Sequence, residues 1–234
     1  MNVSKNISNS FVVFIIVIVC LIFTLNINLV DITIMEARNF VTAREMLLDN
    51  NWLMPTFNGE PRYQKPPLPT WTAAISTLIA GTKTLYIFRI PGFLCLALIG
   101  ITTYYFSLEL LKNKIYSIVN SFIAITSFYT IAIIIEAPWD IFSHSFMYIA
   151  IYFIYKNLNN QKYYFKEILL IILFIACSVL SKGPVSLYAL LAPFLISYFI
   201  SYPTSIGKKL ARILPIIIAG ILIGSSWYIM LLFQ

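Results

Sequence analysis

The chain has 234 residues, of which 60% are hydrophobic and only 11% are charged. Soluble domains usually carry about 25% charged residues, so this composition excludes an ordinary soluble protein and favours a helical membrane protein. The net charge of +7 does not indicate nucleic acid as a partner, because the basic residues lie mostly in short loops between apolar segments. The three cysteines lie within apolar runs and show no CxxC spacing, which predicts buried thiols and neither a disulfide framework nor a zinc site.

The first apolar stretch runs from Ser10 to Val30 and follows Lys5. It is long and lacks a small-residue cleavage site, so we expect a retained first helix and not a signal peptide. The later apolar segments predict an all-α polytopic fold of about seven spans, forming one transmembrane domain over residues 1–234. These segments lie at roughly 84–109, 115–135, 141–155, 167–181, 184–201 and 213–233.

Charged residues assign a side of the membrane to each loop. With the N-terminus in the cytoplasm, the inner loops hold Lys5, Lys112, Lys114, Lys156, Lys162, Lys166, Lys208, Lys209 and Arg212. The outer side then holds most of the acids, namely Asp31, Glu36, Glu45, Asp49, Glu60, Glu136 and Asp140. This distribution predicts a multi-pass protein of the inner or plasma membrane with a cytoplasmic N-terminus.

A polar segment, residues 31–83, separates the first two apolar segments and forms the predicted first outer loop. The pattern Thr33-x-x-Glu36 is a capping box that predicts the start of a helix. Apolar residues cover much of this helix, so we expect it to lie in the plane of the membrane interface. Asn50-Asn51 is expected to end it.

The second half of this segment contains signals for turns and extended backbone. Asn58-Gly59 predicts a turn, and the prolines around Lys65-Pro66-Pro67 favour extended backbone. A second short helix is expected from about Thr70 to Ala80, ending at Gly81.

These motifs and three later ones occur in a recognisable order along nearly the whole chain. They are EARNFVTAREML at 36–47, Asn58-Gly-Glu60, Lys65-Pro-Pro67, Trp71, Ala137-Pro-Trp-Asp140, Ser181-Lys-Gly-Pro184 and Ser226-Trp-Tyr228. Together they resemble the lipid-linked-sugar glycosyltransferases of the protein mannosyltransferase superfamily, in particular the bacterial aminoarabinose transferases that modify lipid A.

The resemblance implies a GT-C fold and an inverting transfer of a sugar from a polyprenyl-phosphate donor to a glycolipid or protein acceptor on the outer face of the membrane. Family members usually continue through several more spans, so the resemblance covers an N-terminal half. A missing C-terminal half or a partner chain is therefore one interpretation of the length.

Two positions depart from the family pattern. The family's acidic dyad reads Met35-Glu36 here, and the acidic residue before Lys-Pro is Gln64. Both departures weaken the case for a divalent metal at this loop, and no cofactor is predicted.

An inverting transfer needs a carboxylate to deprotonate the acceptor and cations to hold the departing phosphate. The catalytic candidates are Glu36, Asp140 and Asp31, and the phosphate-binding candidates are Lys65, Arg38, Arg62 and Lys182. Structural alternatives exist for several of them. Glu36 could serve only the capping box, Asp140 could serve only the helix dipole, and Lys65 could simply reach for lipid headgroups.

Two other functions remain open at this point. A transporter or flippase of polyprenyl lipids would place polar residues in the middle of its spans, whereas here the charges cluster in one outer loop and at helix ends. The second alternative is an inactive half-protein that binds lipid or assembles with another chain.

Overall fold

The computed structural model describes residues 8–25, 31–81, 84–136, 138–160, 164–203 and 205–233. These residues are mainly helical, which confirms the predicted all-α class, and the strands among them form a two-stranded antiparallel ribbon. The chain divides into two compact units, Met1–Arg62 with Pro69–Ile141 and Tyr63–Leu68 with Phe142–Gln234. The single domain over 1–234 stays a prediction. Lys5 and Lys162 lie outside the described residues, as does the side chain of Glu136.

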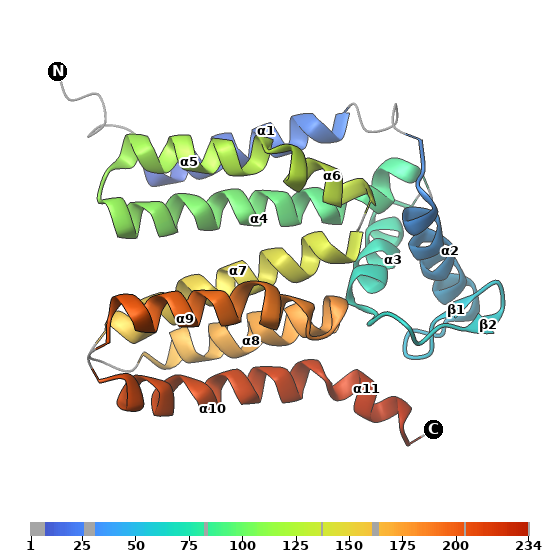
Figure 1. Cartoon of the computed structure of the whole chain (residues 1–234). Helices are drawn as coiled ribbons and strands as arrows, with labels where there is room; N and C mark the ends of the chain where they lie inside the picture. Colours follow the sequence, from blue (N-terminus) through green and yellow to red (C-terminus); the bar gives the residue numbers. More distant parts are fainter. Residues whose placement is uncertain are drawn as a thin grey trace. The chain divides into compact units, whose positions relative to one another are not determined.

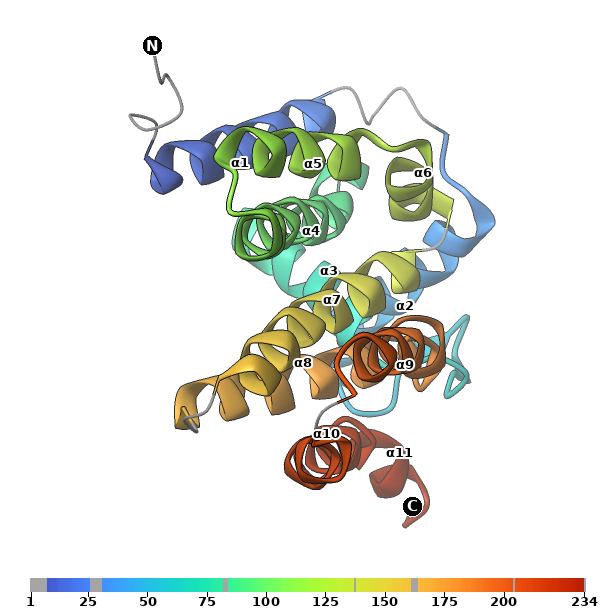
Figure 2. The same ribbon diagram turned by 60° about the vertical axis from the view of Figure 1, so that its left-hand side comes forward.

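Four apolar helices form much of the first unit: α1 (Asn9–Leu25), α4 (Leu85–Leu111), α5 (Lys114–Thr126) and α6 (Phe128–Glu136). Helices α1 and α5 pack along α4 (Figures 1 and 2). Gly100 of α4 makes this close approach feasible, because a Cβ there would lie only 2.6 Å from Ile125 and 2.8 Å from Ile16. The Ser121 hydroxyl donates to the Gly100 carbonyl at 2.7 Å and further ties α5 to α4.

The apolar segment predicted at 115–135 contains a break. Helices α5 and α6 meet at Ser127, where the backbone is extended, and their axes differ by 46°. Within the described ranges, α4 is the one helix long and apolar enough to cross a bilayer alone, and α5 with α6 would form a second, bent span. The count of seven spans therefore stays a prediction.

The polar segment folds into α2 (Ile34–Asp49), strands β1 (Thr56–Phe57) and β2 (Glu60–Pro61), and α3 (Leu68–Ala80). The predicted capping box at Thr33 and Glu36 is present, and α2 ends at Asn50 in the left-handed conformation. The expected turn joins the two strands, with positive φ at Asn58 and Gly59. These local predictions are confirmed because each rests on chemistry within a few residues.

Glu45 of α2 holds the ribbon in place. Its carboxylate accepts hydrogen bonds from the Thr56 hydroxyl at 2.6 Å and from the backbone N–H groups of Asn58 at 2.7 Å and Gly59 at 3.3 Å. Burial by itself would raise the pKa of Glu45, but these three hydrogen bonds and nearby Arg44 lower the pKa below its ordinary value of 4.5. The ribbon is therefore anchored by an ionised carboxylate.

The second unit contains most of α7 (Pro138–Asn159), together with α8 (Phe165–Lys182), the π-helical turn η3 (Leu187–Leu191), α9 (Ala192–Ser201), α10 (Ile206–Gly224) and α11 (Ser226–Leu231). Three fully buried serines join α7, α8 and η3. The Ser143 hydroxyl lies 2.7 Å from that of Ser186 and 3.2 Å from that of Ser178, and the Ser178 hydroxyl donates to the Ser143 carbonyl at 2.8 Å. Such hydroxyl bonds help apolar helices associate where no water competes.

Helix α10 packs directly on α8 through two glycines spaced four residues apart. A Cβ at Gly220 would lie 2.8 Å from the Ile175 side chain, and a Cβ at Gly224 would lie 2.7 Å from the Ala176 carbonyl oxygen. This small-xxx-small spacing lets two backbones approach closely and is typical of helix packing in membranes.

We predict that Gly224→Ala destabilises the chain by about 1–3 kcal/mol, since the new methyl group meets backbone atoms of α8 that cannot move aside. Gly207→Ala is the matched control on the same helix, because nothing lies within 4 Å of its Cβ position. The measurement is thermal unfolding of both purified variants in detergent. Equal melting temperatures for the two would contradict the close packing.

We predict that the β1–β2 ribbon loses its attachment to Glu45 of α2 at acidic pH. A carboxylate whose folded pKa is lowered stabilises the fold above its unfolded pKa, and this contribution is lost as pH falls through the folded pKa, below about 4.5. Hydrogen-exchange protection of the Asn58 and Gly59 amides should therefore fall in this range. The Glu45→Gln variant should show weak protection at every pH, and an unchanged profile in that variant would contradict the role of Glu45.

Candidate functional site

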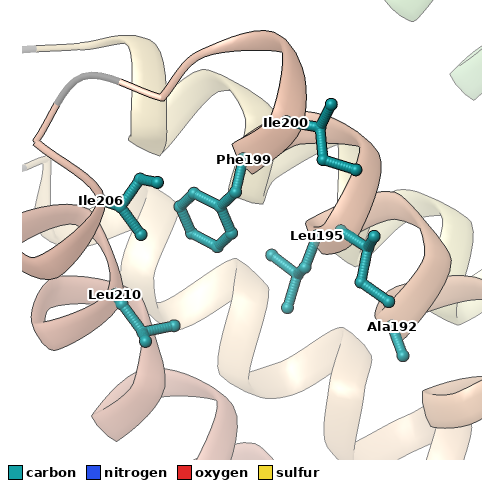
Figure 3. A pocket seen from close by; sticks show the side chains of 7 residues that line it. Ala192, Leu195, Phe199, Ile200, Ile206 and Leu210 are labelled. Atoms are coloured by element: carbon teal, nitrogen blue, oxygen red, sulfur yellow. The ribbon is translucent and has the colours of Figure 1, made fainter.

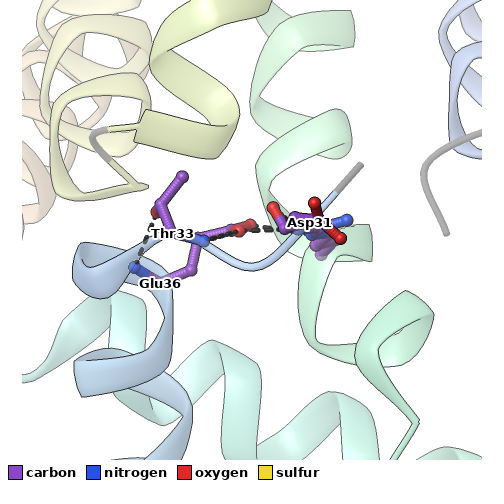
Figure 4. Close-up of polar contacts among 4 residues, drawn as sticks. Asp31, Thr33 and Glu36 are labelled. Carbon is purple, nitrogen blue, oxygen red and sulfur yellow. Dashed lines mark hydrogen bonds and ion pairs between the residues drawn. The ribbon is translucent and has the colours of Figure 1, made fainter. Parts of the chain in front are cut away.

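A buried ion pair joins the start of α2 to α4. Arg89 donates from Nε to Oε1 of Glu36 at 2.8 Å and from Nη2 to Oε2 at 2.6 Å, and both side chains are only 1% exposed. The Thr33 N–H also faces Oε2 at 3.4 Å, while the Glu36 N–H donates to the Thr33 hydroxyl at 3.2 Å (Figure 4). Both carboxylate oxygens of Glu36 are thus occupied by groups of the protein itself.

Arg89 was not predicted from the sequence as part of the site. One signal pointed to it, because it is the single charge in the first five turns of a 27-residue apolar helix. A charge in such a helix is costly and is almost always paired, so a counter-ion had to exist. The sequence offered several acids for this role and did not identify Glu36 among them.

Arg62 is fixed at the end of the ribbon. Its Nη1 donates to the Arg38 carbonyl at 2.7 Å and to the buried Thr42 hydroxyl at 2.8 Å. Its guanidinium also lies over two aromatic rings, 5.2 Å from the Trp139 centroid and 5.6 Å from that of Phe57. Hydrogen bonds and stacking therefore fix the orientation of the Arg62 guanidinium.

The electrostatic surroundings of Arg62 favour an anion. Partial burial and the neighbouring charge of Arg38 both lower the pKa of Arg62. Across the residues that the structure describes, neither Arg38 nor Arg62 forms an ion pair with a carboxylate. Two guanidinium groups that repel each other without a counter-ion form a site where a phosphate would be stabilised.

The remaining predicted residues lie at three places. Asp31 is exposed just before α2, and its carbonyl oxygen lies 3.4 Å from Nη2 of Arg89. Asp140 is half-buried in the first turn of α7, directly after Trp139. Lys65 and Lys182 are half-buried and belong to the second unit, Lys182 in the last turn of α8.

The first unit therefore contains Asp31, Glu36, Arg38, Arg62 and Asp140 of the predicted set. Among these residues, Arg62 donates a hydrogen bond to the carbonyl oxygen of Arg38. Arg62 also lies over the ring of Trp139, the residue that directly precedes Asp140. Within the described part of the chain, no three His, Cys, Asp or Glu side chains gather closely enough to hold a metal ion.

Comparison with solved structures identifies two with a similar fold. ArnT from Cupriavidus metallidurans in the apo state has a TM-score of 0.72 at 15% identity, covering 85% of this chain and 37% of that one. The same protein bound to undecaprenyl phosphate also has a TM-score of 0.72 at 15% identity, covering 93% of this chain and 41% of that one. At this identity the likeness shows the fold alone.

Sequence comparison identifies an uncharacterized protein of Aquifex aeolicus (strain VF5), 29% identical over 145 residues. The match covers 61% of this chain and 28% of that protein, so the chain spans well under half the length of the relatives it matches. The model of the family described as dolichyl-phosphate-mannose-protein mannosyltransferase matches residues 64–229, more than half of the chain. On this match, the chain belongs to the dolichyl-phosphate-mannose-protein mannosyltransferase family.

Proposed function

We propose that the chain acts in a membrane glycosyltransferase that moves a sugar from a polyprenyl-phosphate donor to a lipid or protein acceptor. Membership of a mannosyltransferase family supports transfer of a sugar, and the fold shared with ArnT bound to undecaprenyl phosphate supports the class of donor. The observation that carries the proposal is the arginine pair. Arg62 donates to the Arg38 carbonyl oxygen and lies near the Arg38 charge, and among the described residues neither arginine forms an ion pair with a carboxylate.

The arginine pair suits a departing phosphate. In an inverting transfer, the acceptor oxygen bonds to the anomeric carbon as the bond from that carbon to the phosphate oxygen breaks. The polyprenyl phosphate leaves with additional negative charge, and cations fixed in advance stabilise it. We propose that Arg38 and Arg62 bind this phosphate. Lys65 and Lys182, which belong to the second unit, stay separate phosphate-binding candidates.

The acceptor proton requires a carboxylate that the acceptor hydroxyl can reach. Glu36 was the first candidate, but it is 1% exposed and both its oxygens already accept hydrogen bonds. We therefore propose that Glu36 positions α2 and that Asp140 is the base. Asp140 directly follows Trp139, whose ring lies under the Arg62 guanidinium. Asp31 is the alternative base.

The proposed membrane arrangement follows the charges. We propose a multi-pass protein of about seven spans in the inner or plasma membrane, with the N-terminus in the cytoplasm and the polar segment 31–83 on the outer face. The apolar helix α4 supports membrane insertion. The donor and acceptor would then meet at the outer interface.

The role of Glu36 is tested by removing the ion pair in two ways. Glu36→Gln leaves the Arg89 charge buried without a carboxylate, and we expect a loss of about 3–5 kcal/mol in stability. The double variant Glu36→Leu with Arg89→Leu removes both charges and should recover most of that loss. The measurement is thermal unfolding in detergent, followed by sugar transfer for every variant that folds.

The two roles of Glu36 predict different outcomes for the double variant. If Glu36 only positions α2, the double variant should fold and retain measurable sugar transfer. A folded double variant with no transfer at all would instead assign Glu36 as the base.

The function itself is tested first by binding of undecaprenyl phosphate to the purified full chain, measured by native mass spectrometry. We expect Arg62→Gln and Lys65→Ala to weaken binding by roughly tenfold to a hundredfold each, as for the loss of a charged hydrogen bond. Arg44→Gln is the control, because Arg44 is an exposed arginine of the same helix as Arg38. Equal binding by all four proteins would contradict the proposed phosphate site.

A further variant separates the alternative functions. Asp140→Asn should bind the lipid normally but transfer sugar at least roughly a hundredfold more slowly. Lipid binding without transfer by the unmodified chain would instead support a lipid transporter, or a half-protein that needs another chain.

A further inference from the structure

An apolar groove lies between α9 and α10 in the second unit (Figure 3). Its volume is about 510 Å³, and the described residues that line it are all apolar, namely Ala192, Leu195, Ile196, Phe199, Ile200, Ile206 and Leu210. This volume is within the range of about 300–1,000 Å³ that is typical of small-ligand sites. Several lining residues are well exposed, including Ile196 at 62% and Ile200 at 74%. The groove therefore offers an open, apolar channel along two helices.

The net charge of the protein lies entirely in the unit that contains this groove. The first unit has eight basic and eight acidic residues, whereas the second has eight basic residues and a single acid, Glu167. No aspartate or glutamate occurs anywhere after Glu167 in the sequence. Glu167 itself contacts Lys156 at 3.6 Å. Lys208 and Lys209 at the start of α10 therefore have no acidic residue in the sequence from 168 to 234 that could neutralise them.

Several of these cations gather at one end of the second unit, where α7 and α9 end and α10 begins (Figure 1). Arg212 donates to the Asn160 carbonyl at 2.8 Å, and the Tyr198 hydroxyl donates to the Asn159 side chain at 2.8 Å, so these termini are in contact. Lys208 is exposed in the first turn of α10.

Lys209 lies against the rings of two tyrosines near the C-terminal end of α9. Its Nζ lies 5.0 Å from the ring centroid of Tyr198 and 5.8 Å from that of Tyr202, both on the α9 side. Ile206 and Leu210, which flank the two lysines in the sequence, line the groove. Apolar residues that line the groove and two lysines therefore share the first turns of α10.

We propose that this groove binds an anionic diacyl phospholipid, with one acyl chain lying along α9 and α10 and the phosphate next to Lys208 and Lys209. The apolar lining recognises the chain, and the uncompensated lysines select an anionic headgroup over a zwitterionic one. The site is independent of the proposed donor site, because it shares no residue with it. In the proposed topology it opens on the cytoplasmic face.

The test is native mass spectrometry of the delipidated full chain, titrated with phosphatidylglycerol and with phosphatidylcholine of the same acyl chains. We expect tighter binding of phosphatidylglycerol. The variant Lys208→Gln with Lys209→Gln should weaken that binding roughly thirtyfold, at about fivefold for each lysine near a phosphate. The matched control is Lys112→Gln with Lys114→Gln, two lysines at the junction of α4 and α5 in the other unit, which should leave binding unchanged.

The acyl-chain part of the site is tested by filling the groove. Leu195→Trp, and separately Ala192→Phe at an exposed position, should each weaken binding of phosphatidylglycerol about tenfold, as for the loss of about two buried methylenes. Using two positions guards against one variant that fails to fold, which circular dichroism detects.

Three results would overturn the proposal: equal affinity for phosphatidylcholine, unchanged binding by the lysine variant, or unchanged binding by folded groove variants. Displacement of phosphatidylglycerol by undecaprenyl phosphate would assign the groove to the donor lipid and also overturn it. Lys65→Ala should not affect phosphatidylglycerol binding, so failure of the donor site and failure of this site give different results.

Discussion

The buried ion pair between Glu36 and Arg89 determines how the polar segment meets the apolar helices of the first unit. Burial of either charge alone costs several kcal/mol, so neither residue is tolerated in this place without the other. The same carboxylate completes the capping box at Thr33, so the start of α2 and its contact with α4 depend on one side chain. Helix α2 in turn supplies the carbonyl and hydroxyl groups that hold Arg62.

Arg62 and Arg89 illustrate how surroundings decide the role of the same side chain. Arg89 is compensated inside the fold by two parallel hydrogen bonds to a carboxylate, so its charge is unavailable to a ligand. Arg62 is held by neutral acceptors and aromatic faces, which fix its geometry and leave its charge uncancelled. In this arrangement partial burial and the nearby charge of Arg38 lower the pKa of Arg62, and under the proposed function a phosphate would offset that repulsion.

The sequence predicted the parts of this fold that depend on neighbouring residues. The capping box at Thr33, the end of α2 at Asn50, the turn at Asn58-Gly59 and the end of α3 near Gly81 each follow from chemistry within four residues. The break at Ser127 was missed, because an apolar run of about twenty residues predicts one helix by its composition. The partners of Glu36, Glu45 and Arg62 were missed for a different reason. The hydrogen-bond partners of these side chains outside the capping box lie 11 to 53 residues away along the chain, and nothing in local pattern distinguishes one candidate partner from another.

The basic residues of the two units differ in how far acidic residues balance them. In the first unit, acids and bases are equal in number, and their contacts fix the helices and the ribbon around Arg38 and Arg62. In the second unit the helices associate largely through glycines and serines, which need no charge, and basic residues such as Lys209 and Arg212 add contacts to aromatic rings and to a carbonyl group. A surplus of positive charge destabilises a compact unit through self-repulsion unless anions surround it. In the proposed topology, the anionic surface of a membrane would supply this counter-charge to the second unit.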